Sequence, residues 1–154
     1  FLALPPVEQL IGGFTQFTDE WKNVLSLLRT TVLDDVSHII VKYVAKVLDV
    51  PAFVLFPGQD GKLRVWARSA TDVDLEPHEM TVAQWSLING KMAGAGTETL
   101  ANAKVFFLPM KSEEDVVGLI GLQYEYKNLL LDQRRLLGAI ASLAALGALR
   151  WVKT

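Results

Sequence analysis

The sequence predicts an α+β fold in which helices cover one face of a central antiparallel sheet and the N- and C-terminal helices form a bundle. Two pairs of β-rich segments each have a polar turn between them, which is the pattern of a β-hairpin. Segments with apolar residues at helical spacing precede, separate and follow these hairpins. The predicted order is therefore α-α-β-β-α-β-β-α.

Length and composition favour one folded domain. The chain has 154 residues, of which 51% are hydrophobic and 21% are charged, and these fractions exclude a disordered chain. The net charge of −2 leaves no basic face of the kind that a nucleic-acid binder needs. The absence of cysteine excludes disulfides, zinc–thiolate sites, iron–sulfur clusters and thiol catalysis. We predict an irregular or poorly ordered leader over residues 1–17 and a single domain over residues 18–154.

The N-terminal part of the domain is predicted to hold two helices. Thr18 is suited to cap a helix over residues 19–29, and Thr31 is suited to cap another over residues 32–48. Acidic residues follow each threonine, where the helix dipole favours them. The second helix cannot continue into Pro51. Because the sequence begins with Phe rather than Met, we expect a piece of a longer protein.

The first hairpin and a third helix follow. The hairpin joins residues 52–56 to the alternating segment 62–69 through a turn that contains Gly and Pro. Residues 79–89 carry apolar side chains at roughly helical spacing. Gly90 is suited to end this helix, since glycine readily adopts the left-handed conformation of a C-terminal cap.

The second hairpin and a long apolar helix complete the chain. Strands are predicted over residues 105–110 and 116–126, with an acidic turn between them. Residues 130–152 form a helix whose apolar and small side chains occupy more of its circumference than one sheet can cover. We therefore expect this helix to pack on a partner helix as well, and to form a homodimer together with the helix at residues 19–29.

The segment between the third helix and the second hairpin is the main candidate for a binding site. Gly94 and Gly96 can adopt positive φ and leave backbone N–H groups open, and Thr97 and Thr99 add hydroxyls. Such a loop can wrap a small polar or anionic ligand. It matches neither the phosphate loop of nucleotide hydrolases nor the glycine pattern of dinucleotide sites. The alternative, a connecting loop that only holds a helix onto a sheet, stays open.

Four aromatic residues are expected to meet near this loop. They are Trp66, Trp85, Phe107 and Tyr124. Aromatic side chains of this kind either fill a core or form the wall of a small-ligand pocket. Together with the two glycines and two threonines of the loop, they make up the predicted ligand-binding set.

No catalytic or metal centre is predicted. His38 and His78 are far apart in the sequence and lack the spacing of metal ligands. The carboxylate pairs lie at helix starts or in turns, and no serine lies in a nucleophile-elbow motif. We therefore predict a chain without catalytic residues, metal or cofactor.

The region around the candidate loop resembles a known family. A tryptophan in a helix is followed by a glycine turn, an AG-x-GT-x-TL segment, a strand ending in Leu-Pro and a glycine-containing strand. The residues that carry this pattern are Ala83, Trp85, Asn89-Gly90, Ala93-Gly94, Gly96-Thr97, Thr99-Leu100, Leu108-Pro109, Val117-Gly118 and Gly121. Over about residues 32–153 the chain resembles a GAF domain, a PAS-related sensing module, and is most similar to the GAF domain of KdpD-type potassium-sensing histidine kinases.

The resemblance implies a sensory role. It implies a dimeric, membrane-anchored parent in which this domain lies on the cytoplasmic side of the inner membrane and regulates a kinase core in the potassium or osmotic response. The chain lacks the cysteine of bilin-binding GAF domains and the Asn-Lys-x-Asp signature of cyclic-nucleotide GAF domains. Two alternatives stay open, namely the input domain of a transcription activator and a purely structural dimerisation module.

Overall fold

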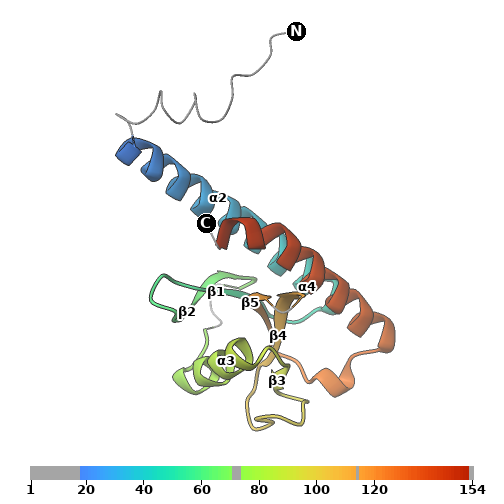
Figure 1. The fold of residues 1–154 in the computed structure, drawn as a ribbon. Helices are drawn as coiled ribbons and strands as arrows, with labels where there is room; N and C mark the ends of the chain where they lie inside the picture. Colours follow the sequence, from blue (N-terminus) through green and yellow to red (C-terminus); the bar gives the residue numbers. More distant parts are fainter. Residues whose placement is uncertain (1–17, 71–73, 114, 153–154) are drawn as a thin grey trace.

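The computed structural model describes residues 18–70, 74–113 and 115–152, and it describes side-chain surroundings within residues 31–147 of these ranges. The leader predicted for residues 1–17 lies outside them. Figure 1 labels the elements, which are α2 (Thr18–Leu48), β1 (Ala52–Pro57), β2 (Leu63–Arg68), α3 (Pro77–Asn89), β3 (Ala93–Gly94), β4 (Phe106–Ser112), β5 (Asp115–Leu122), the 3-10 turn η2 (Tyr126–Asn128) and α4 (Leu131–Val152).

The five strands form one antiparallel sheet in the order β2-β1-β5-β4-β3. The hairpins β1–β2 and β4–β5 supply four of these strands, and the pairing of β1 with β5 joins the hairpins, with Val54 opposite Ile120. The predicted antiparallel sheet built from two hairpins is confirmed. The two-residue strand β3, which pairs Ala93 with Phe107, is too short to be recognised from residue alternation.

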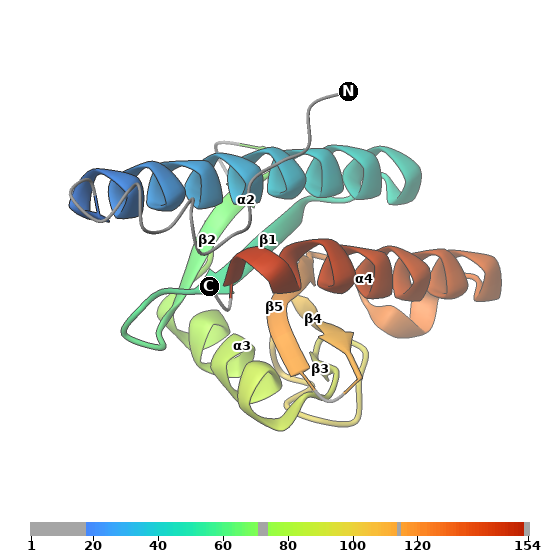
Figure 2. The same ribbon diagram turned by 45° about the horizontal axis from the view of Figure 1, so that its top comes forward.

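Helices cover both faces of this sheet. Figures 1 and 2 show α2 and α4 side by side over one face and α3 on the opposite face. Along β1, Val54 and Phe56 belong to the core cluster under α2 and α4, whereas Phe53 and Leu55 belong to the cluster under α3. The expectation that all helices lie on one face is therefore wrong for α3. Because β1 is buried on both sides, a single helical layer would leave half of its apolar side chains in water.

Helix α2 is continuous, although two helices were predicted for this region. It runs for 31 residues without a break at Thr31. A threonine followed by acidic residues is a local capping signal, but threonine also occurs inside helices. Leu33 and Ile40, which follow Thr31, are buried in the core cluster that α4 also joins. This packing holds the part of α2 that follows Thr31 against the sheet and α4.

The other boundaries agree with local chemistry. Pro77 opens α3, a position where its missing N–H costs nothing, and Gly90 ends the helix with φ of 63°. Strand β5 ends at Leu122, four residues before its predicted end, and Tyr126 begins the turn η2. None of the helices within the described ranges combines the length and hydropathy needed to cross a membrane.

Candidate functional site

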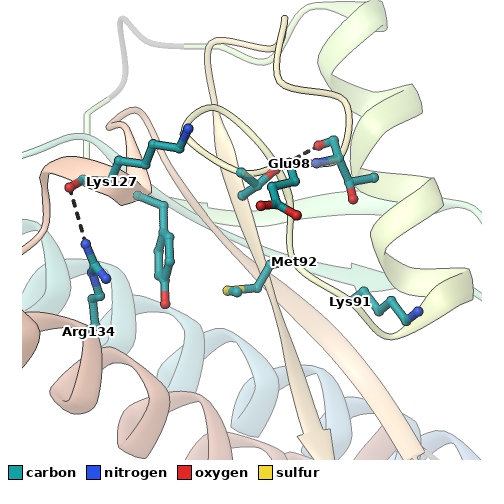
Figure 3. Close-up of a pocket in the computed structure, with 9 residues that line it drawn as sticks. Lys91, Met92, Glu98, Lys127 and Arg134 are labelled. Atoms are coloured by element: carbon teal, nitrogen blue, oxygen red, sulfur yellow. Dashed lines mark hydrogen bonds between the residues drawn. The ribbon is translucent and has the colours of Figure 1, made fainter.

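A cleft of about 610 Å³ opens beside the predicted loop, and we call it the loop cleft. Three segments build it: the loop after α3, the turn η2 and the first turns of α4 (Figure 3). Its lining consists of Lys91, Met92, Gly96, Thr97, Glu98, Thr99, Tyr126, Lys127 and Arg134. The volume lies within the usual range for sites that bind small molecules.

Buried polar side chains of α3 anchor the loop at both ends. At its start, the Ser86 hydroxyl donates to the Lys91 carbonyl over 2.6 Å. At its end, the Glu79 carboxylate accepts hydrogen bonds from the backbone N–H groups of Lys104, over 2.8 Å, and Val105, over 3.3 Å. Glu79 is only 4% exposed, and these two N–H groups balance the cost of burying its charge. The loop is therefore held to α3 on both sides.

Hydrogen bonds inside the loop fix its shape. The N–H of Gly94 donates to the Thr99 carbonyl over 2.9 Å. The Thr97 hydroxyl lies 2.7 Å from the Gly94 carbonyl and 2.8 Å from the Thr99 carbonyl, and it can donate to one of them. The same oxygen accepts from the Thr99 N–H over 3.2 Å. The Thr97 side chain thus serves the loop's own structure.

Gly96 lets the loop touch η2. Its φ is 77°, and a Cβ added there would lie 2.3 Å from the backbone nitrogen of Tyr126. The carbonyl of the neighbouring Ala95 accepts a hydrogen bond from that nitrogen over 3.4 Å. A side chain at position 96 would push these two backbone segments apart. This close approach explains how residues about 30 positions apart in the chain line one cleft.

Tyr126 forms a fixed wall of the cleft. Its ring stacks on Phe106 with ring centroids 5.0 Å apart and an interplanar angle of 25°. The guanidinium of Arg134 lies 4.8 Å from the Tyr126 ring centroid. Arg134 also donates from Nε to the Leu129 carbonyl over 3.1 Å and from Nη2 to the Lys127 carbonyl over 3.3 Å. Arg134 therefore ties η2 to the first turns of α4.

The cleft carries mixed charge. Lys91, Lys127 and Arg134 are cationic, and Glu98 is anionic. Within the described residues, none of these four side chains takes part in an ion pair; the two pairs found there, Arg64–Asp60 and Arg68–Asp74, lie on other segments. The side chains of Lys91, Glu98 and Lys127 also have no hydrogen-bond partner in the described part of the protein. Their hydrogen-bonding capacity is therefore unused within the described residues.

The structure separates the predicted aromatic residues. Trp66, which meets Phe56 edge to face at 5.9 Å, and Tyr124 pack on the cluster under α2 and α4. Trp85 and Phe107 belong to the cluster under α3. None of these four residues lines the loop cleft.

Of the predicted loop residues, Gly96, Thr97 and Thr99 line the cleft, and Gly94 lies next to them in β3. Sequence reasoning missed Tyr126, Lys127 and Arg134, because no local pattern links them to the loop. Gly94 and Gly96 were the sequence signal for this site, because glycine often marks a place where another backbone segment comes close. They do not indicate which segment that is.

A second surface feature is an apolar groove between α2 and α4, which we call the helix groove. It encloses about 360 Å³ and is lined by Val36, Ile39, Ile40, Tyr43, Ile140, Leu143, Ala144 and Gly147. Ile39 is 68% exposed and Leu143 is 69% exposed. Among the described residues, no group of three His, Cys, Asp or Glu side chains is arranged to hold a metal ion.

Comparisons with known proteins place these features in a family context. Residues 32–150 match the family model described as GAF domain. The chain is 32% identical to the sensor protein KdpD of Escherichia coli (strain K12) over 106 residues, which are 68% of this chain and 12% of that protein. It is 26% identical to the sensor protein KdpD of Clostridium acetobutylicum over 102 residues, 62% of this chain and 11% of that protein. The chain thus spans about a ninth to an eighth of the length of these relatives.

The chain is similar in both fold and sequence to a solved GAF domain. The crystal structure of the native GAF domain of the potassium sensor histidine kinase KdpD from Escherichia coli superposes with a TM-score of 0.65 at 26% identity. The match covers 85% of this chain and 95% of that one. The likeness therefore extends over nearly the whole solved domain.

Proposed function

The chain belongs to the GAF domain family, and we propose that it is the regulatory domain of a KdpD-like sensor histidine kinase in the potassium or osmotic response. The sequence similarity to two sensor proteins KdpD and the shared fold support this proposal. In it, catalysis belongs to the kinase core of a membrane-anchored parent, and this domain lies on the cytoplasmic side. The domain itself senses and relays rather than catalyses.

We further propose that the relay operates through a homodimer formed by α2 and α4. The observation that carries this proposal is the helix groove, in which Ile39 and Leu143 stay largely exposed. Contiguous exposed apolar surface of this kind usually marks an interaction site. The same groove on a second copy is equally apolar, so a twofold arrangement would cover both at once. Figure 1 shows the N-terminal half of α2 extending beyond the sheet.

Ile39→Glu tests the dimer. A glutamate in the groove would place an unpaired charge in the interface, so we expect the variant to sediment as a monomer at concentrations where the unaltered chain is a dimer. Ile88→Glu is the matched control, because Ile88 is 73% exposed but lies on α3, on the other face of the sheet. We expect this control to remain dimeric. A monomeric unaltered chain at high concentration, or identical behaviour of the two variants, would contradict the dimer.

The loop cleft supports the sensory half of the proposal. It is large enough for a small molecule, and it adjoins the first turns of α4, the helix that also lines the helix groove. A ligand there would lie beside the first turn of α4, at Arg134. In the proposed mechanism, ligand binding changes how α4 sits against its partner.

A further inference from the structure

We propose that the loop cleft binds a small zwitterion of the amino-acid class, whose anionic group meets Lys127 and whose ammonium group meets Glu98. This inference deepens the proposed sensory role and rests on it. It assigns a ligand class to the cleft from the charges and surfaces that line it.

Two unpaired groups of opposite sign face the same space. Glu98 and Lys127 line the cleft from two different segments, and Figure 3 shows the Glu98 carboxylate above Met92 and the Lys127 side chain extending toward the loop. Neither group has an ion-pair or hydrogen-bond partner within the described residues. Lys91 extends away from that space, and Arg134 is turned toward the backbone of η2 (Figure 3). Lys127 and Glu98 are therefore the charged groups whose hydrogen-bonding capacity a ligand can use, and the Arg134 guanidinium adds positive charge to the cleft lining.

Charge decides the ligand class. A purely anionic ligand would gain from Lys127 but be repelled by Glu98, and a purely cationic ligand would meet the reverse. A zwitterion satisfies both groups at once, because each of its charges finds an opposite one. This requirement favours a small molecule that carries both an ammonium group and a carboxylate.

The other residues that line the cleft suit a zwitterion with an apolar side chain. Met92 is 37% exposed and lines the cleft, and methionine sulfur makes favourable contacts with aromatic rings. Tyr126 adds an aromatic edge whose position is fixed by Phe106 and Arg134. The cleft therefore offers polar contacts to the amino-acid backbone and an apolar surface to its side chain.

Three probes that share a phenyl group separate the charge requirements. L-Phenylalanine carries both charges, 3-phenylpropionate carries only the anion, and 2-phenylethylamine carries only the cation. We expect nuclear magnetic resonance titration at millimolar concentrations to show saturable shifts of the Met92 methyl and Tyr126 ring signals with L-phenylalanine. Each single-charge probe is expected to bind about fivefold more weakly, which is the effect of one partly exposed ion pair.

Charge-neutral variants assign each contact. Glu98→Gln is expected to weaken L-phenylalanine about fivefold while leaving 3-phenylpropionate no weaker, and Lys127→Gln is expected to weaken both. The matched controls Glu76→Gln and Lys62→Gln alter exposed charges outside the cleft lining and should change nothing.

Two outcomes would overturn the inference. One is equal binding of all three probes, and the other is the absence of any shift at Met92 and Tyr126. Sedimentation of the same samples keeps this test separate from the dimer, since a dimeric chain that binds no zwitterion refutes the ligand class alone. A monomeric chain that binds L-phenylalanine refutes the dimer alone.

Discussion

Two buried serines differ in whether the side-chain hydroxyl has a hydrogen-bond partner, and this difference should determine how each one contributes to stability. Ser37 on α2 and Ser86 on α3 are both fully buried within helices. The Ser86 hydroxyl donates to the Lys91 carbonyl over 2.6 Å, whereas the Ser37 hydroxyl is the one buried side-chain oxygen or nitrogen in the described residues without a partner. A buried hydroxyl without a partner keeps the desolvation cost and gains nothing in return. The two residues should therefore respond oppositely to the same substitution.

We predict that Ser37→Ala raises the free energy of unfolding by about 1–2 kcal/mol, through the loss of the unpaired hydroxyl and a better helix propensity. Ser86→Ala should lower it by about 1–2 kcal/mol, because the Lys91 carbonyl would lose its donor. Urea unfolding followed by circular dichroism measures both changes. A destabilising Ser37→Ala would mean that its hydroxyl has a hydrogen-bond partner in solution.

Among the loops and turns, two glycines share a conformation but not an environment. Gly61 in the β1–β2 turn and Gly96 in the cleft loop have φ of 78° and 77°. A Cβ at position 61 would meet nothing within 4 Å, whereas one at position 96 would meet the backbone of Tyr126 at 2.3 Å. Gly61 is therefore needed only for its φ, but Gly96 is also needed for the contact between the loop and η2.

Alanine at each position separates the two effects. Gly61→Ala should cost about 1 kcal/mol, the strain of a left-handed alanine. Gly96→Ala should cost about 3 kcal/mol or more, because the loop and η2 must also move apart. Urea unfolding measures the costs, and the Tyr126 ring signals report the displacement. Equal costs for the two variants would show that the loop yields easily and that the cleft is not fixed by this contact.

Much of the element layout could be predicted from the sequence, because its signals are local. Alternation in residues 62–69 and the helical spacing that ends at Gly90 identify β2 and α3 within a few residues. The continuity of α2 could not be predicted, since a threonine that caps a helix and a threonine inside a helix look alike in the sequence. The face on which α3 lies also depends on tertiary contacts alone.

The candidate site could be predicted only in part, for the same reason. Gly96, Thr97 and Thr99 are recognisable as part of a glycine- and threonine-rich loop, and all three line the cleft. The open backbone N–H groups expected there are instead bonded within the protein at Gly94, Ala95, Thr97 and Thr99. Tyr126 and Arg134 join them through a contact between distant segments, which leaves no periodic trace in the sequence. The aromatic residues were expected beside the loop, but Trp66 in β2 and Phe107 in β4 pack on opposite faces of the sheet. Trp85 on α3 and Tyr124 after β5 are likewise divided between the two clusters.

At the scale of the whole molecule, α4 links the two surfaces. Arg134 in its first turns lines the loop cleft, and Leu143 farther along lines the helix groove. A packed helix moves largely as one body, so a ligand that shifts its beginning also shifts its apolar face. Under the proposed function, ligand binding and dimer geometry are then coupled, and the coupling is reciprocal.

The stability of the whole molecule should depend on its concentration. If α2 and α4 form a homodimer that dissociates on unfolding, each tenfold rise in chain concentration adds about 1.4 kcal/mol per dimer, or about 0.7 kcal/mol per chain. For a chain of this size, that raises the thermal midpoint by about 1–3 °C. Differential scanning calorimetry over a hundredfold range of concentration measures the shift. Ile39→Glu should abolish the dependence and Ile88→Glu should keep it, because only the first alters the helix groove. A midpoint of the unaltered chain that stays constant over this range would contradict a homodimer that dissociates on unfolding.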